Sequence, residues 1–364
     1  VTWQTLTAGT STPTISAGNK ILWKQTGLTP SSNSGIGTFS STKKFNIYGN
    51  IMSLYYGDDF IGKNDLTGKN YAFSKLFFNC KNLISADYLI LHATTLSDYC
   101  YNFMFNMCTS LTKAPELPAT TLASYCYFQM FGSCSSLTKA PELPATQLRS
   151  SCYNYMFSYC TSLTKAPELQ ATTLASYCYT FMFNSCSSLI KAPELPATKL
   201  EVSCYRGMFS GCRSLTTAPE LQVNTLANDC YFSMFYNCES LEKAPDLLAT
   251  KLVNSCYYRM FKGCKKLRYV KCLATNISAT DCLTDWLDGT ILLGTFITAD
   301  NPPVWTTGTS GIPSGWNSYT ESQYEEVRHY ELTNKVSSST ENMKIEVVNT
   351  LPETPVENTI YIIV

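Results

Sequence analysis

Cysteine is the residue whose type and spacing first suggest chemistry in this chain. Its thiol can act as a nucleophile, form a disulfide or bind a metal ion. The 364-residue sequence contains 17 cysteines, and most of them fall into two series with a period of 26 residues. The first series is Cys100, Cys126, Cys152, Cys178, Cys204, Cys230, Cys256 and Cys282. The second series, eight residues behind the first, is Cys108, Cys134, Cys160, Cys186, Cys212, Cys238 and Cys264.

The spacing of the cysteines limits what they can do. Within one repeat, two cysteines eight residues apart on a helix are separated by ~12 Å, too far for a disulfide. Between repeats stacked ~5 Å apart, equivalent cysteines come within bonding distance, but an unbroken column does not divide neatly into pairs. A zinc site would need a Cys-x-x-Cys motif or more histidines than His92 and His329. We therefore expect columns of reduced, buried thiols, with disulfides between repeats and metal binding as the alternatives.

Other catalytic groups are sparse. A Cys–His nucleophile would need one of two distant histidines beside an activated thiol. Carboxylates recur beside lysines in every repeat, so no pair stands out as an acid and a base. No Gly-rich phosphate loop is present. The segment Tyr56-Gly57-Asp58-Asp59 is expected to form a turn, with a calcium site at Asp58-Asp59 as the alternative. We therefore expect no enzymatic activity, no cofactor and no metal.

A whole unit repeats, and not only the cysteines. The best-preserved copy runs from Leu122 to Pro144, and its residues recur at equivalent positions in the other copies. A fixed period in this range is typical of a solenoid, in which each unit buries its apolar face only against its neighbours. The sequence therefore predicts an α/β repeat solenoid, similar to leucine-rich repeats and built from 26-residue units, over residues 66–290.

Within each unit, apolar residues step by four along the chain. Placed on a helix, they fall within one half-turn. This inward set is Leu122, Ala123, Cys126, Tyr127, Met130, Phe131 and Cys134. The other half varies from copy to copy, as a solvent-facing half would. We therefore predict a helix over residues 122–134 and a short extended segment over Leu137–Leu143, where Pro141 keeps the helix from continuing.

Nine aromatic residues occupy the outward half of the predicted helices. They are Tyr99, Phe103, Tyr125, Phe128, Tyr155, Tyr177, Phe181, Phe232 and Tyr258. Aromatic side chains supply much of the binding energy at interfaces, and on stacked coils these would line up. We therefore predict a binding surface formed by Phe103, Tyr125, Phe128, Tyr155, Tyr177, Phe181, Phe232 and Tyr258. The alternative is that these rings only pack coil against coil.

Two charged columns also recur after the predicted helix. The lysine column is Lys113, Lys139, Lys165, Lys191 and Lys243, with Thr217 as the exception. The acidic column is Glu116, Glu142, Glu168, Glu194, Glu220 and Asp246. Each column repels itself, and the neighbouring opposite column offsets that repulsion. The columns are interpreted as a solvated face, with a polar recognition surface as the alternative.

The ends of the chain differ from the repeats. Residues 1–65 are rich in Thr, Ser and Gly, and Phe45–Gly49 alternates like a strand, so a small β capping domain is predicted there. After the solenoid, residues 291–316 are predicted to form an irregular closing segment. The remaining residues, 317–364, are predicted to form a small β segment.

Two strands are expected in this last segment. They cover Lys344–Val348 and Asn358–Val364 and are expected to form a hairpin. The apolar end of the chain is unusual for a free tail. It is therefore a candidate strand for pairing within the chain, or with another copy in a homo-oligomer or larger assembly.

The amino-acid composition argues against two classes of partner. The 27 basic residues balance 27 acidic ones, which argues against a nucleic-acid partner and against attraction to an anionic membrane. No apolar run approaches the ~20 residues of a membrane span, so no membrane insertion is expected. The sequence begins at Val1 without a methionine, which fits a processed product and leaves export open.

The repeat resembles a known family. The order Phe131, Cys134, Leu137 and Pro141 is similar to the Phe, Cys, Leu and Pro of BspA-like leucine-rich-repeat surface proteins of gut Bacteroidetes. The resemblance covers roughly residues 66–290. It implies a surface-exposed, extracellular protein with a role in adhesion that recognises protein or glycan on a cell surface.

A second function stays open. The segment from Leu351 to Tyr361 resembles short segments of phage structural proteins from the same bacteria. That resemblance implies a structural or receptor-binding component of a bacteriophage particle, in a tail or fibre. The predicted localisation is therefore the cell surface, with the virion as the alternative.

Overall fold

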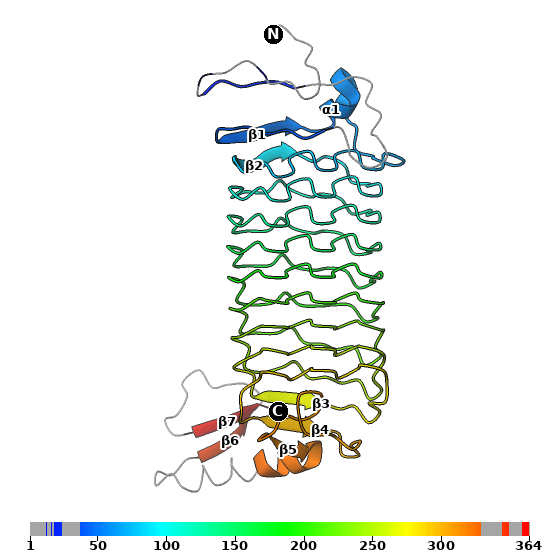
Figure 1. Ribbon diagram of the computed structural model, residues 1–364, viewed down its shortest axis with the longest axis vertical. Coiled ribbons are helices and arrows are strands. Elements are labelled where there is room, and N and C mark those ends of the chain that lie inside the picture. The colour runs from blue at the N-terminus through cyan, green and yellow to red at the C-terminus, as the bar shows by residue number, and fades with distance from the viewer. Residues whose placement is uncertain are drawn as a thin grey trace.

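The chain folds around a tall stack of coils, and each coil is one 26-residue unit (Figure 1). The computed structural model describes residues 12, 16, 18–23, 37–328, 344–348 and 359–363. Backbone N–H groups of one coil donate to carbonyl groups of the next, as from Tyr125 N to Ser150 O over 3.1 Å. These hydrogen bonds between successive units establish the repeat stack that the sequence predicts.

The predicted helix over residues 122–134 is wrong, because these residues form a ribbon of successive turns. The N–H of Phe128 donates to the carbonyl of Tyr125, three residues back, over 3.1 Å. The next N–H, of Gln129, donates instead to Asn154 in the following coil over 2.9 Å. This alternation continues along the ribbon and satisfies each backbone donor from residue 125 to 134. The coils are therefore not α/β units, since they contain no helix in this ribbon.

Every fourth residue of the ribbon has a left-handed backbone. In one coil these residues are Tyr125, Gln129 and Ser133, with φ of 57°, 50° and 60°. On a helix of 3.6 residues per turn, side chains four residues apart point in directions that differ by about 40°. In the turn ribbon, side chains four residues apart point in the same direction. The step of four in the sequence therefore belongs to turns. Left-handed backbone costs roughly 1–2 kcal/mol for a residue with a side chain, and the hydrogen bonds between coils hold it in place.

The ribbon directs residues inward and outward in pairs. Cys126 and Tyr127 are fully buried, Phe128 and Gln129 are half-buried, and Met130 and Phe131 are fully buried again. The predicted inward set is therefore buried, except for the half-buried Ala123, although its backbone is different. Buried rings stack in columns, with 5.8 Å between the centres of Tyr127 and Tyr153.

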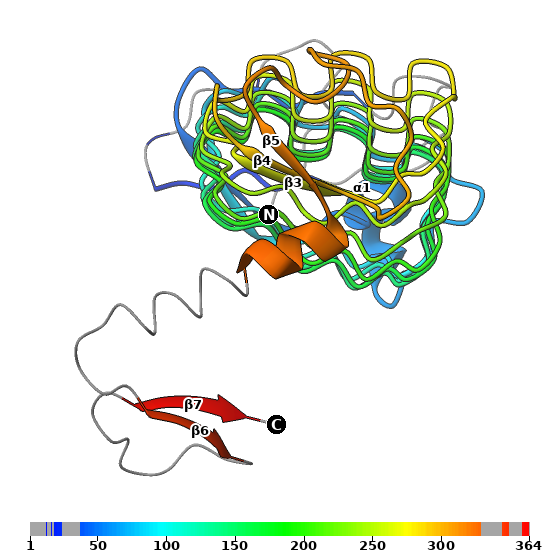
Figure 2. The same cartoon turned by 90° about the horizontal axis from the view of Figure 1, so that it is seen from below.

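The predicted extended segment closes the coil on another side. It makes isolated parallel bridges between coils and not continuous strands, as between Lys139 and Lys165 and between Leu143 and Leu169. Pro141 lies between these bridges and has no N–H to donate. Seen end-on, the turns give each coil one undulating edge (Figure 2). We call the turn-forming side the ribbon side and the side of these bridges the bridging side.

The N-terminal end of the stack is closed by a single strand. Strand β1 (Phe45–Asn50) confirms the predicted strand and pairs in parallel with β2 (Leu83–Ile90) of the first repeat. The expected turn at Tyr56–Asp59 is instead the junction of a short helix, α1 (Ser53–Tyr56), and a 3-10 helix, η1 (Gly57–Phe60). In the described part of residues 1–65, β1 is the one strand, so the predicted β domain is an extension of the stack.

A parallel three-stranded sheet covers the other end. It contains β3 (Tyr269–Cys272) of the last repeats, β4 (Thr295–Thr298) and β5 (Asn317–Thr320), in the order β3-β4-β5. Residues 321–328, directly after β5, are helical. The closing segment over 291–316 thus contributes a regular strand to the stack.

The two predicted C-terminal strands are present as β6 (Lys344–Val348) and β7 (Thr359–Ile363). They pair in parallel, so the expected hairpin is wrong, because a hairpin joins antiparallel strands. None of the helices in the described part of the chain is long and apolar enough to cross a membrane.

Candidate binding surface

The structure places the predicted aromatic residues on the outward side of the turn ribbon. Tyr177 is 43% exposed, and the others are half-buried between neighbouring side chains. The half-buried residues are Phe103, Tyr125, Phe128, Tyr155, Phe181, Phe232 and Tyr258. Ring contacts between neighbouring coils divide the predicted residues into two rows, and Tyr177 belongs to neither.

The main row runs along several coils and is called the aromatic row: Phe103, Phe128, Tyr155, Phe181, Phe232 and Tyr258. Ring centres of Tyr155 and Phe181 lie 4.9 Å apart, and those of Phe232 and Tyr258 lie 4.4 Å apart, both stacked. Stacking along the coils covers much of the ring faces. The row therefore packs coil against coil, as the alternative interpretation expected, and remains partly exposed.

Tyr125 belongs to a second, shorter row. Its ring stacks on Tyr99 with 4.6 Å between centres, and Tyr99 stacks on Tyr71 at 4.7 Å. Tyr177 occupies the same position of a later coil, but the equivalent residues in the adjacent coils are Ser151 and Ser203. Without a ring above or below it, Tyr177 is more exposed.

Between its two stacked pairs, the aromatic row contains an arginine that the sequence prediction did not include. Arg206 places its guanidinium carbon 3.7 Å from the ring centre of Phe232, and its Nη1 lies 3.4 Å from Asp229 Oδ1. The next residue, Gly207, has a φ of 59°. The Phe181 ring lies over it, so a Cβ there would overlap the ring. Arg206 therefore adds a positive charge to the aromatic row.

Two exposed apolar residues of the ribbon were also missed. Tyr159 is 55% exposed and Met107 is 40% exposed. Both have left-handed backbone and occupy the outward position equivalent to Ser133. A helix of 3.6 residues per turn rotates this position toward the inward half, whereas a strict four-residue step keeps it outward. The constant step of four was the signal that could have found them.

The charged columns lie on the bridging side and interact mainly at their ends. Lys113 pairs with Asp87 at 3.3 Å, and Asp246 lies 3.8 Å from Lys271, which also pairs with Glu321 at 2.8 Å. In the middle of the stack the two columns border a shallow recess. It is lined by Lys139, Ala140, Glu142, Lys165, Ala166, Pro167 and Glu168.

All 17 cysteines are free and buried. In the second series the thiol donates to a carbonyl of the preceding coil, as from Cys134 Sγ to Phe105 O over 3.1 Å. Burial raises the pKa of Cys160 and of Cys212 to about 12. A thiol with such a pKa is protonated near neutrality, so these cysteines are poor nucleophiles in the folded chain.

The other groups that could carry chemistry are scattered. His92 is exposed, and His329 lies outside the described residues. Asp58 and Asp59 lie in η1. Within the described ranges, no three or more His, Cys, Asp or Glu side chains gather where they could hold a metal ion. The geometry therefore gives no support to the calcium alternative.

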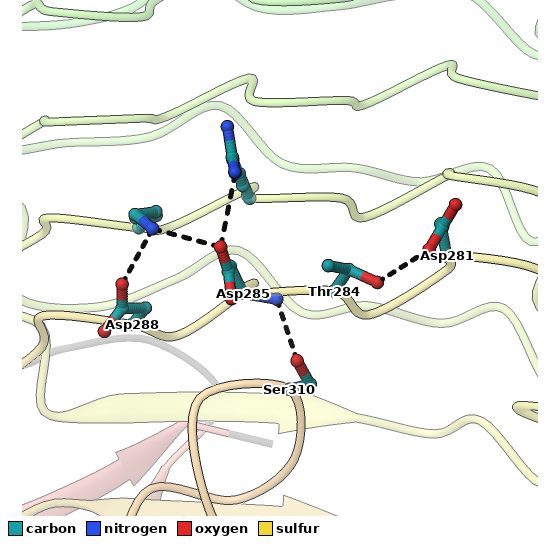
Figure 3. Close-up of polar contacts among 7 residues, drawn as sticks. Asp281, Thr284, Asp285, Asp288 and Ser310 are labelled. Atoms are coloured by element: carbon teal, nitrogen blue, oxygen red, sulfur yellow. Dashed lines mark hydrogen bonds and ion pairs between the residues drawn. The ribbon is translucent and has the colours of Figure 1, made fainter.

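The last coil carries a network of polar contacts on the ribbon side (Figure 3). Asp285 pairs with Lys262 at 3.0 Å and with Arg259 at 3.3 Å, and Lys262 also reaches Asp288 at 2.8 Å. The backbone N–H of Asp285 donates to Ser310 Oγ over 3.0 Å. The loop that carries Ser310 therefore supplies an acceptor where the next coil would otherwise stand.

No protein-family model matches the chain, and no curated protein matches it. Among solved structures, the crystal structure of the leucine-rich repeat protein TpLRR of T. pallidum is 15% identical. The match covers 71% of this chain and 74% of that chain with a TM-score of 0.21, which is too low to indicate a common fold.

Proposed function

We propose that this chain is a non-enzymatic adhesion protein, displayed on a bacterial surface, that binds protein or glycan through the ribbon side of its stack. The observation that carries the proposal is the aromatic row with Arg206 at its centre. Partly exposed rings and an arginine are the residue types that dominate binding energy at interfaces. They are fixed on a regular backbone, so little conformational entropy is lost when a ligand binds.

The shape of the described surface supports a ligand that lies along the stack. The recesses between coils are shallow, as is the one beside Lys139. A small substrate is usually enclosed in a deep pocket, whereas an extended polymer or a protein surface is bound on an open face. We therefore propose contact across several coils.

We also propose that the chain has no enzymatic activity. Its support is chemical: the thiols are buried with raised pKa, and the carboxylates of the repeats are equivalent to one another. Neither group offers a single activated residue.

The test is a variant in which the row loses its rings. Phe128, Phe181, Phe232 and Tyr258 are replaced by serine, and binding of the labelled chain to cells is measured. Because the rings also stack between coils, thermal unfolding of the variant is followed in parallel. The matched control replaces Ile190 and Leu248 with serine; they are 55% and 36% exposed and adjoin the bridge residues Lys191 and Leu247. Loss of binding in the row variant alone, with the fold retained, is expected; unchanged binding would contradict the proposed site.

The kind of cell that the chain binds distinguishes the adhesin hypothesis from the phage-particle hypothesis. The chain is offered to gut bacteria and, separately, to mammalian epithelial cells with their matrix. Binding to epithelial cells or matrix is the expected result for the adhesin. Selective binding to bacteria would instead favour a receptor-binding role in a bacteriophage particle.

A further inference from the structure

The bridging side carries two straight rows of opposite charge. We call Lys113, Lys139, Lys165, Lys191 and Lys243 the lysine row, and Glu116, Glu142, Glu168, Glu194, Glu220 and Asp246 the acidic row. Successive members are 26 residues apart, one to a coil, except that Thr217 interrupts the lysine row between Lys191 and Lys243, so both rows run along the stack. The rows are three residues apart in the chain, which is about 10 Å at most.

In the middle of the stack these charges are not paired with one another. Lys139, Lys165 and Lys191 are exposed, and so are Glu142, Glu168 and Glu194. Among the residues that the structure describes, none of these six forms an ion pair within 4.0 Å. Like charges follow one another at the spacing of coils, ~5 Å, where they repel. The face therefore favours a partner that presents the opposite charge at the same spacing.

Between the rows lies the shallow recess described above. Its floor is formed by Ala140, Ala166 and Pro167, which are already buried, and the charged residues Lys139 and Glu142 border it. The exposed part of this face is therefore charged, positive on one side and negative on the other.

We propose that this face binds a second copy of the chain. A two-fold axis parallel to the stack places the lysine row of each copy opposite the acidic row of the other, because the rotation exchanges the two sides of the face. A two-fold axis across the stack would place like rows together. The face is thus self-complementary in one arrangement, as an isologous dimer requires, and the two copies lie side by side in the same direction.

The second copy matches the spacing of the charges better than an unrelated polymer does. Both copies have the same coil spacing, so a Lys–Glu pair formed in one coil recurs in the next, except in the coil where Thr217 replaces the lysine. Such pairs are exposed and individually weak, and their attraction is screened by salt. The dimer is therefore expected to be salt-sensitive. It leaves the ribbon side free, so it is independent of the proposed ligand-binding face.

The test compares two variants whose faces carry a single sign of charge. In one, Lys139→Glu, Lys165→Glu and Lys191→Glu make both rows acidic; in the other, Glu142→Lys, Glu168→Lys and Glu194→Lys make both rows basic. Molar mass is measured by light scattering of the full chain after size exclusion, at an ionic strength of about 0.02 M and again near 1 M, where the Debye length is about 3 Å. Circular dichroism checks that each variant is folded.

The wild type is expected to be dimeric at low salt and monomeric at high salt. Each single-sign variant should be monomeric, an equimolar mixture of the two should form the dimer, and the variant with all six changes should again dimerise by itself. If a reversal variant does not fold, replacement of the same lysines by glutamine should weaken the wild-type dimer at least tenfold. A wild type that stays monomeric at low salt, or a dimer that survives the charge reversals, would overturn the proposal.

Discussion

Arg206 stacks on Phe232 of the following coil, with its guanidinium carbon 3.7 Å from the centre of the ring. The same guanidinium contacts Asp229 at 3.4 Å, and about a third of each charged side chain is exposed. Stacking and ion pairing at a partly exposed site each stabilise by about 0.5–1 kcal/mol. The contact thus joins two coils and also fixes a cation within the aromatic row.

The first prediction concerns this contact. Arg206→Ala should lower the free energy of unfolding by about 1 kcal/mol, because both the cation–π contact and the ion pair are lost. Arg206→Lys should recover only part of the loss, since an ammonium cannot stack as a planar guanidinium does. Urea denaturation of the three proteins measures both effects. Equal stability of the lysine and arginine forms would show that charge alone matters here.

The second prediction concerns Gly207, over which the Phe181 ring lies. Gly207→Ala should destabilise the fold by about 1–3 kcal/mol, because alanine at a φ of 59° is strained and its Cβ overlaps the ring. In a double-mutant cycle, Phe181→Ala should relieve the overlap but not the backbone strain. An additive cycle would mean that the ring moves aside without cost.

The third prediction concerns pH. Burial raises the pKa of the Cys160 thiol from an ordinary value of 9.0 to about 12, so the folded chain holds this proton more tightly than the unfolded chain. The contribution of this thiol to stability should therefore be constant below pH 8 and should fall as the pH rises from about 9 toward 12. The full effect for one such thiol is about 4 kcal/mol. Urea denaturation in a reducing buffer at several pH values measures it.

A reaction control accompanies the pH series. Near neutrality, a thiol reagent should modify the buried cysteines only as fast as the chain opens. Rapid labelling of the native protein at neutral pH would contradict the burial of the thiol columns.

The fourth prediction concerns the end of the stack. Ser310→Ala removes the acceptor for the N–H of Asp285 and should cost about 0.5–1 kcal/mol, because the bond is exposed and water can replace the hydroxyl. Ser310→Thr keeps the hydroxyl and should stay close to the wild type. Hydrogen exchange at the Asp285 amide reports on the cap directly, and it should accelerate in the alanine variant alone.

Much of the burial, but not the backbone, could be predicted from the sequence. Cys126 and Tyr127 were expected inside and Phe128 outside, because apolar residues recur every four positions and the outward ones vary. A four-residue step lies close to the 3.6 residues of a helical turn, which made the helix the nearer interpretation. Residues such as Tyr125 and Gln129 rarely have left-handed backbone, so no local propensity indicated the turns. Only the hydrogen bonds between coils make that backbone stable.

The candidate surface was predicted in part for a similar reason. Position within a repeat shows which residues face outward, so Phe181 and Phe232 were found. The contact of Arg206 with Phe232 and the position of the Phe181 ring over Gly207 depend on how successive coils are aligned. That alignment is set by hydrogen bonds between units, which a single repeat does not reveal.

The direction of those hydrogen bonds has an electrical consequence. The peptide group between Cys126 and Tyr127 points its carbonyl toward the preceding coil and its N–H toward the following one, and alternate peptide groups along the ribbon do the same. Their dipoles add along the stack, as they do in a helix, with the positive end at the last coil. Lys69, Lys75 and Lys81 lie at or beside the first turn ribbon, and Asp281, Asp285 and Asp288 lie in the last. Each set has the sign that stabilises its end, so the solenoid behaves as a macrodipole compensated at both poles.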